Sequence, residues 1–219
     1  MGKGNKILVP LLVLGGFLAF TKREEIEDVA DQIVLSFMPA QFIIKYFKDA
    51  LDAQKVSGVP FLVTLAQAGL ESNWGKSAPG FNFFGHKVGS TWTGETQKLK
   101  TWECGSSGDA VKDRIKDEVI QIFPPGSPAG NSSCNAKGFY SYRVYGKFRK
   151  YPSAKDAFIA HGLFLKNNKR YERAFFTKTP EAFITEVARA GYATDPTYAQ
   201  KNINLFDSIR TIITKNKLA

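Results

Sequence analysis

The sequence is poor in the side chains that most often bind metals, with only two histidines and two cysteines among 219 residues. Cys104 and Cys134 lie far apart and neither belongs to a CxxC pair, which excludes the usual zinc sites of closely spaced cysteines and histidines. We therefore expect no metal and no cofactor. The two cysteines could form a disulfide outside the cytoplasm, worth about 3–4 kcal/mol by loop closure, or remain as free thiols.

The chain also lacks internal repeats, a Gly/Ser-rich linker and any recognisable nucleic-acid-binding motif. Its formal net charge of +10 suits an anionic partner such as nucleic acid, a membrane surface or an acidic polymer. Because the basic residues are spread along the chain rather than clustered, we expect no nucleic-acid partner. With 43% hydrophobic residues, the chain can bury one substantial core, or a core divided between two lobes.

Long apolar runs are scarce as well. The longest, residues 7–20, would be about 21 Å long as a helix, which is short for a hydrocarbon core of about 30 Å. Basic residues flank this run on both sides and could reach the two interfaces. We predict that residues 1–23 form an uncleaved membrane anchor. A cleaved signal peptide is the alternative, although the small-residue cleavage pattern is poor.

Helical periodicity follows the apolar run. Residues 24–57 carry two apolar stripes, the first ending near Pro39, and predict a helical segment that leads into a domain over residues 58–219. Pro60 suits the first position of the next helix. The residues expected to face the core from that helix are Leu62, Leu65, Ala66, Gly69 and Leu70.

Glu71 stands at the end of this predicted apolar helix, just before a Trp-Gly turn. Apolar surroundings and the negative end of the helix dipole both disfavour an ionised carboxylate. A carboxylic acid that stays protonated near neutral pH is what general acid catalysis needs. By itself, a lone glutamate is more often a solvated helix-end residue, so this observation requires support from the rest of the chain.

The remaining chain alternates β-forming segments with capped helices, which predicts a mainly helical α+β fold. We expect extended segments at residues 91–96, 97–103 and 139–151, and a helix at residues 109–123, where apolar side chains recur at helical spacing. Later helices are expected to begin after Ser153, after Thr179 and at Asp195, with Gly191 ending the second of them.

One long motif resembles a known family. Residues 66–80 read Ala-Gln-Ala-x-Leu-Glu-Ser-x-Trp-Gly-Lys-Ser-Ala-Pro-Gly, and Asn82-x-Phe84-Gly85-x-Lys87 follows. This pattern resembles the signature of the bacterial and phage N-acetylglucosaminidases of glycoside hydrolase family 73, which include flagellar and autolysin-type peptidoglycan hydrolases. The stretch Gly-Tyr-Ala-Thr-Asp-Pro-x-Tyr-Ala at residues 191–199 resembles the closing motif of the same family. The resemblance covers residues 40–104 and 139–213 and leaves residues 105–138 as an insertion.

The resemblance implies a lysozyme-like, two-lobed fold with a small β-lobe, here preceded by an N-terminal hydrophobic helix. It also implies a second catalytic carboxyl group in a Trp-x-Gly … Thr-x-Glu pattern, which this sequence matches with Glu103; Glu95 in the same region is the weaker candidate. Tyr192 is expected to line the substrate cleft near Glu71. The other residues expected to contact substrate are Tyr198, Trp74 and Asn82.

The expected function is cleavage of the β-1,4 bond after N-acetylglucosamine in peptidoglycan, with Glu71 as the acid and Glu103 as the second carboxylate. Two alternatives stay open: a lytic transglycosylase that uses Glu71 alone, and an inactive membrane-tethered wall-binding or virion protein. The expected location places the domain on the wall side of a membrane that residues 7–20 contact, in a bacterium or in a phage virion. Secretion after signal cleavage is the alternative.

Overall fold

The computed structural model describes the backbone of residues 18–106 and 118–219, and side chains from residue 38 onward within these ranges. The chain divides into two units, Met1–Gln41 and Phe42–Ala219. The predicted apolar anchor at residues 7–20 lies mostly outside the described residues. Among the helices that the structure describes, none has the length and apolarity that crossing a membrane would need.

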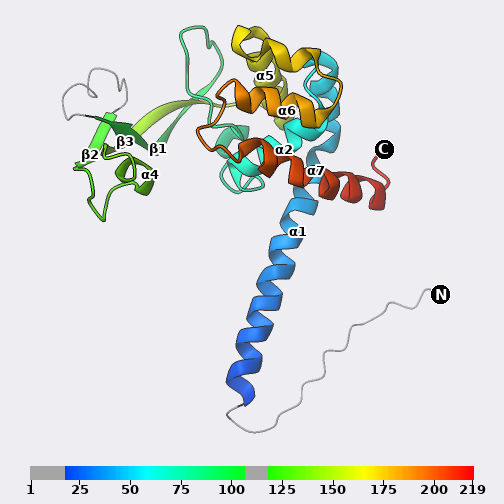
Figure 1. Ribbon diagram of the computed structural model, residues 1–219, viewed down its shortest axis with the longest axis horizontal. Helices are drawn as coiled ribbons and strands as arrows, with labels where there is room; N and C mark the ends of the chain where they lie inside the picture. The colour runs from blue at the N-terminus through cyan, green and yellow to red at the C-terminus, as the bar shows by residue number, and fades with distance from the viewer. Residues whose placement is uncertain (1–17, 107–117) are drawn as a thin grey trace. The chain divides into compact units, whose positions relative to one another are not determined.

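The first helix, α1, runs from Leu18 to Ser57 without interruption (Figure 1). Pro39 lies inside this helix, and the predicted end of the first apolar stripe near it stays a prediction, since the side chains before residue 38 lie outside the described part. A proline removes only one backbone donor, and the helix-forming residues Met38, Ala40 and Gln41 flank it here. Within the second unit, Phe42, Ile43 and Phe47 of α1 are buried in the main core.

Helix α2, Phe61–Ser72, begins directly after Pro60, as the sequence predicts. Its side chains from Leu62 to Gly69 are all buried, and the helix packs against α6 and α7. Leu70 is a correction, because 38% of its surface is exposed. Almost the whole circumference of the helix is buried, so no single apolar stripe predicts which residues face the core. Leu70 is exposed because the chain leaves the core at that point.

Four further elements complete the helical part: α5 (Ala154–Asn167), the 3-10 helix η2 (Lys169–Phe176), α6 (Pro180–Arg189) and α7 (Tyr198–Lys215). The predicted caps of α5 and α6 are confirmed: Ser153 accepts a hydrogen bond from the amide of Asp156, and Thr179 accepts one from Ala182. Asp195 does not begin α7. Its carboxylate instead accepts hydrogen bonds from the amide and hydroxyl of Thr197, and the helix begins at Tyr198.

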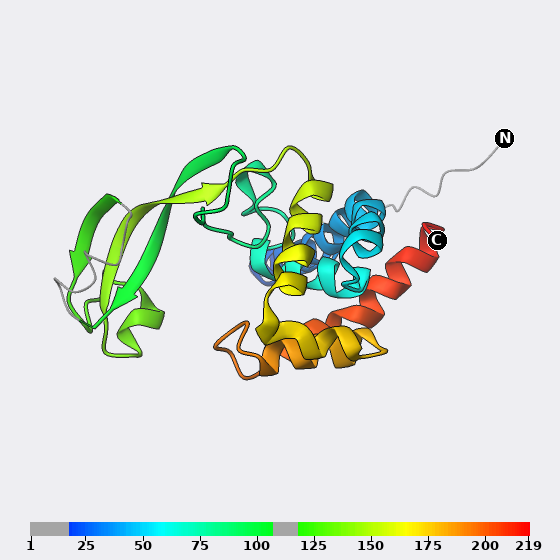
Figure 2. The same cartoon turned by 90° about the horizontal axis from the view of Figure 1, so that it is seen from above.

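The sheet is antiparallel and has three strands in the order β1-β3-β2, as Figure 2 shows for the long neighbours β1 and β3. Strand β1 spans Thr96–Gly105, β2 spans Glu118–Phe123 and β3 spans Tyr140–Arg149. Residues 91–95, which were expected to be extended, precede β1 as turns and bends. Tyr142 and Val144 form a small separate core with Val119, Ile122 and Tyr140.

Of the helix predicted at residues 109–123, residues 109–117 lie outside the described residues. Strand β2 corrects the rest of that prediction. Its apolar residues match a helical spacing, but the segment is rich in β-branched side chains and pairs with β3 from Glu118↔Tyr145 to Phe123↔Ser141. The predicted insertion at residues 105–138 thus supplies the third strand and the short helix α4, Ser132–Asn135.

The segment between α2 and β1 connects the base of the sheet to the helical part. It contains the 3-10 helix η1, Pro79–Phe81. The amide of Tyr151 donates to Gly80 O at 2.8 Å, and the amide of Arg149 donates to His86 O at 2.9 Å. These backbone bonds fix the end of β3 beside the loop that follows Glu71.

Candidate active site

The position of Glu71 is set by the turn that ends α2. Asn73, Trp74 and Gly75 all have positive φ angles of 49°, 54° and 85°, so the chain reverses over three left-handed residues. The indole of Trp74 folds back over Gly69, where an added Cβ would lie only 2.5 Å from a ring carbon. This contact requires glycine at position 69. The end of the helix that carries Glu71 is thereby fixed by local packing.

The Glu71 carboxyl group is held by one tyrosine. The buried Tyr198, from the first turn of α7, donates its hydroxyl proton to Glu71 Oε1 at 3.1 Å. Glu71 as a residue is exposed, but the partial burial of its carboxyl group against the core raises the pKa of Glu71, and the hydrogen bond from Tyr198 offsets part of that rise. Burial, followed by the Glu71 charge, also raises the pKa of Tyr198 far above its usual range, so the phenol keeps its proton. The raised proton affinity that the sequence predicts for Glu71 is thus confirmed in direction.

The Tyr198 hydroxyl is itself hydrogen-bonded to a series of further polar side chains. Gln67 Nε2 donates to the Tyr198 hydroxyl at 3.0 Å, and Gln67 Oε1 lies 3.1 Å from His161 Nε2. His161 Nδ1 lies 3.3 Å from His86 Nε2, and His86 Nδ1 lies 2.8 Å from the Tyr151 hydroxyl. Five hydrogen bonds therefore run in series from Glu71 to Tyr151. The sequence predicts a structural role for the two histidines and none for Gln67.

Glu103 occupies a different setting, on strand β1 opposite Tyr142. Its carboxylate forms an ion pair with Lys87, and the side chain keeps 31% of its surface exposed. Glu95, the weaker candidate, pairs with Lys150 at 2.7 Å and is 73% exposed. The structure thus gives Glu71 and Glu103 different partners, and the pairing of the two as catalytic carboxyls stays a prediction.

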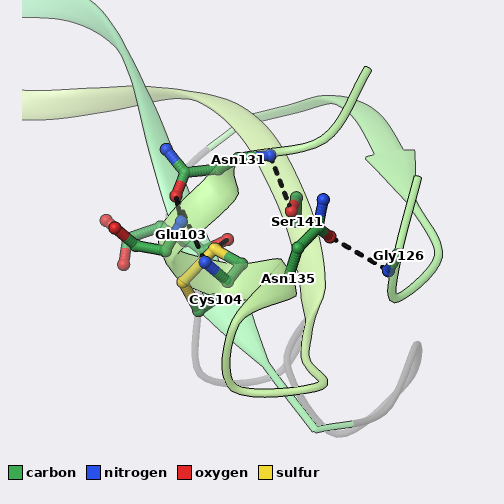
Figure 3. Close-up of a disulfide and its surroundings, with 8 residues drawn as sticks. Glu103, Cys104, Gly126, Asn131, Asn135 and Ser141 are labelled. Carbon is green, nitrogen blue, oxygen red and sulfur yellow. Dashed lines mark hydrogen bonds between the residues drawn. A yellow bond between two sulfur atoms is a disulfide. The ribbon is translucent and has the colours of Figure 1, made fainter. Parts of the chain in front are cut away.

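Cys104 and Cys134 form a disulfide, which resolves the alternative that the sequence left open (Figure 3). The bond joins the end of β1 to α4. Asn131 caps α4 through its side chain, and its amide donates to Ser141 Oγ of β3 at 2.9 Å. The Asn135 side chain accepts from the amide of Gly126 at 3.1 Å. The crosslink and these hydrogen bonds hold the insertion against the strand residue that follows Glu103.

The family can now be identified. The sequence model of the glucosaminidase family, described as mannosyl-glycoprotein endo-beta-N-acetylglucosaminidase, matches residues 47–211. The chain belongs to the glucosaminidase family. Peptidoglycan hydrolase FlgJ of Pseudomonas aeruginosa is 31% identical over 179 residues, which cover 78% of this chain and 37% of that protein. FlgJ of Salmonella typhimurium is 29% identical, with 80% of this chain and 47% of that protein covered. This glucosaminidase chain spans less than half the length of these curated relatives.

Solved structures agree with the family. The glycoside hydrolase domain of Salmonella typhimurium FlgJ matches with a TM-score of 0.59 and 26% identity, covering 82% of this chain and 92% of that one. The peptidoglycan hydrolase from Sphingomonas sp. A1 matches with a TM-score of 0.55 and 26% identity, covering 80% and 94%. The glucosaminidase domain is therefore a glycoside hydrolase with a lysozyme-like fold, mostly helical with a small antiparallel sheet.

The other residues of the glucosaminidase that were predicted to contact substrate differ in their surroundings. The Tyr192 ring stacks on Tyr198 with centroids 5.5 Å apart, which places it beside the Glu71 partner as expected. Trp74 packs edge-on against Phe42 at 5.8 Å in the main core. Asn82 is buried, and its side chain forms hydrogen bonds with the backbone N and O of His86. The assignment of these residues to substrate binding stays a prediction.

One feature of the sequence could have indicated this series of hydrogen bonds. Gln67 is a polar residue in the middle of an apolar helical run, and a buried amide must find hydrogen-bond partners. Those partners could not be named, since His86, His161 and Tyr198 come from distant segments. In the part of the chain that the structure describes, no group of three His, Cys, Asp or Glu residues could hold a metal ion.

Proposed function

We propose that this glucosaminidase hydrolyses peptidoglycan and cleaves the β-1,4 bond after N-acetylglucosamine. The observation that carries the proposal is the Glu71 carboxyl, whose pKa is raised by burial and which receives a hydrogen bond from Tyr198. A carboxylic acid of raised pKa can protonate the oxygen of the leaving sugar. The names of the relatives, which are peptidoglycan hydrolases, support this substrate.

Glu103 supplies the second carboxyl group in this proposal. Glycoside hydrolysis uses one carboxyl group as the acid and another to activate water or to stabilise the positive charge that develops on the sugar ring. The ion pair with Lys87 orients the Glu103 side chain on β1. In the proposed two-lobed arrangement, the glycan strand lies between the sheet and the helical part.

A groove near the base of the sheet has side chains suited to a glycan strand, although neither Glu71 nor Glu103 is among its lining residues. It has a volume of about 590 Å³, and Arg149, Phe164, Asn167 and Lys169 are among the residues that line it. The rings of Tyr171 and Tyr192 lie 6.1 Å apart and continue from Phe164 toward Tyr198. Aromatic faces bind sugar rings, while amides and cations bind acetamido and carboxylate groups.

The location is part of the proposal. A disulfide persists in oxidising compartments, and this supports a domain that works on the wall side of a membrane. We propose that residues 7–20 anchor the enzyme beside its substrate, in a bacterial envelope or a phage virion that opens the wall locally. Membrane partition of the full chain and of residues 24–219 tests this. Equal partition of the two proteins would remove the anchor.

Purified peptidoglycan treated with the wild type and with Glu71→Gln tests the reaction. The variant keeps the shape of the side chain but cannot donate a carboxylic proton, so turnover should fall by about 10²–10⁴-fold. Mass spectrometry of the products should find reducing N-acetylglucosamine ends. Anhydro-muramyl ends would instead identify a lytic transglycosylase, and residual activity within tenfold of the wild type would remove Glu71 from the acid role.

A further inference from the structure

We infer that Gln67, His161 and His86 are positioning residues for the reaction: they hold the Tyr198 hydroxyl so that its proton is directed at one oxygen of Glu71. The inference rests on the proposed role of Glu71 as the acid. It adds a function for two buried side chains and the partly buried His86, none of which contacts the acid itself.

The Gln67 amide determines which group donates and which accepts in each hydrogen bond of the series from Tyr151 to Glu71. Its Nε2 faces the Tyr198 hydroxyl at 3.0 Å and can only donate, so Tyr198 must give its own proton to Glu71. Glu71 Oε1 is thereby an acceptor in every turnover. The acidic proton of Glu71 must then lie on Oε2, the oxygen that is left to face the leaving sugar.

The orientation of that amide determines which nitrogen of each histidine carries the proton. Gln67 Oε1 can only accept, so His161 carries its proton on Nε2, 3.1 Å away. His161 Nδ1 must in turn accept from His86 Nε2 at 3.3 Å, and His86 Nδ1 accepts from the Tyr151 hydroxyl at 2.8 Å. One assignment of protons, with both histidines neutral and protonated on Nε2, satisfies all five bonds.

The surroundings keep both rings neutral. Burial and then the nearby Arg149 guanidinium lower the pKa of His86 to about 4. Burial, followed by the neighbouring His86, lowers the pKa of His161 well below its usual value. The Phe84 ring stacks on His161 with centroids only 3.7 Å apart and an interplanar angle of 7°. Neither histidine therefore acquires the second proton that would reverse the series at neutral pH.

Burial makes the arrangement sensitive to the loss of any member. Gln67 and His161 have no exposed surface, and Tyr198 is 6% exposed. A buried polar group that loses its partner costs about 1–3 kcal/mol, so the other members would move to find new partners. Gln67 and Glu71 are four residues apart on α2 and share one face, so such a shift reaches the acid directly.

The first experiment needs no substitution. Nitrogen-15 NMR of the histidine rings in the wild-type protein at pH 7 should show both side chains neutral and protonated on Nε2. An Nδ1-protonated form of either ring contradicts the direction of the series and overturns the inference. This measurement is independent of whether the protein hydrolyses peptidoglycan.

The second experiment measures the pKa of the Glu71 carboxyl by carbon-13 NMR, together with kcat and KM against pH. Gln67→Met, which removes both bonds of the amide, should lower kcat about tenfold with little change in KM. It should also raise the Glu71 pKa, because Tyr198 loses the partner that directs its proton. Tyr198→Phe should raise that pKa as well, and the double variant should add no further shift, since both changes act on one hydrogen bond.

Two further variants guard against misfolding. His161→Gln keeps a donor near the position of Nε2 and should restore most of the kcat that His161→Phe loses. Thr64→Val changes a buried polar residue on α2 outside the series and is the control for stability alone. If Gln67→Met lowers the melting temperature as Thr64→Val does and leaves the Glu71 pKa and kcat unchanged, the series is only structural. Activity in Glu71→Gln would instead refute the proposed reaction while leaving the NMR results intact.

Discussion

The helical part and the sheet of this glucosaminidase hold their candidate carboxyl groups in opposite ways. Glu71 projects from a helix whose neighbours are almost all buried, and its partner is a neutral phenol at 3.1 Å. Glu103 projects from a strand of a three-stranded sheet, and its partner is the exposed cation Lys87. The difference lies in the charge of the partner, since Glu71 receives a hydrogen bond from a neutral group and Glu103 pairs with a cation.

The two regions also differ in what stabilises them. The helical part shares one continuous core, whereas the sheet has only a small cluster around Tyr142 and Val144 and is crosslinked by Cys104–Cys134. Small sheets bury too little apolar surface to be stable alone. Changes in the helical part should therefore affect proton affinity, whereas changes in the sheet should affect whether the strand that carries Glu103 is held in place.

Glu103→Gln tests the sheet side of the comparison and should have the largest effect. If the two carboxyl groups divide the chemistry, turnover should fall by about 10²–10⁴-fold while binding to insoluble peptidoglycan stays close to that of the wild type. Turnover and sedimentation assays measure the two quantities. Full activity of this variant would leave Glu71 working alone, as in a transglycosylase.

Removal of the disulfide should destabilise the sheet more than the helical part. Replacing both Cys104 and Cys134 by serine should destabilise the protein by about 3–4 kcal/mol through the lost loop constraint. Amide hydrogen exchange should become faster in β1 and β3 but change little in α2 and α5. Faster exchange throughout the helical part would mean that the two regions unfold as one unit.

Acid should weaken the helical part through His86. Its pKa in the folded protein, about 4, is below the usual value of 6.5, so the neutral ring stabilises the fold fully above about pH 6.5. This contribution is lost as the pH falls from 6.5 towards 4 and amounts to about 3 kcal/mol at most. Urea titrations at pH 7 and pH 4.5 measure the loss, which should be smaller in His86→Gln. An equal loss in both proteins contradicts the prediction.

Gly69→Ala should cost about 1–2 kcal/mol of stability. The added methyl group would lie 2.5 Å from the Trp74 ring, and the cost of overpacking outweighs the better helix propensity of alanine. Thermal unfolding measures the change. Adding Trp74→Leu, which opens space for the methyl group, should recover part of it. A neutral Gly69→Ala would mean that the indole can move without disturbing the end of α2.

Glu95→Gln should have the smallest effect and is the control for Glu103. Glu95 lies in the open beside Lys150, and an exposed ion pair of this kind contributes little to stability. Turnover and the melting temperature should both match the wild type. If this variant loses activity and Glu103→Gln does not, the two glutamates exchange roles.

Local sequence signals predicted most of the helical part. The caps at Ser153 and Thr179, and the turn at Gly191 with its φ of 78°, follow from side-chain chemistry within a few residues. The place of Glu71 at the end of an apolar helix is also a local signal, whereas its catalytic role was predicted from the resemblance to the family. These predictions succeed because the interactions that decide them are close in sequence.

The misassigned elements depend on distant partners. Residues 118–123 match a helical spacing, yet they form a strand because β3, about 20 residues later, offers an edge to pair with. The series from Gln67 through His161 to His86 joins α2, α5 and a loop, and no periodicity reports such a contact. Sequence patterns indicate that a buried amide needs partners, but only the fold supplies them.

The order of the strands determines which of them are available for pairing with another copy of this protein. In the described sheet β3 is central, so β1 and β2 provide the two open edges. Open edges attract strands from other molecules, and charged side chains and prolines oppose such pairing. Lys98 and Lys100 lie on β1, Glu118 lies on β2, and Pro124 and Pro125 follow its end. In the described sheet, both edges therefore carry features that oppose pairing with another copy.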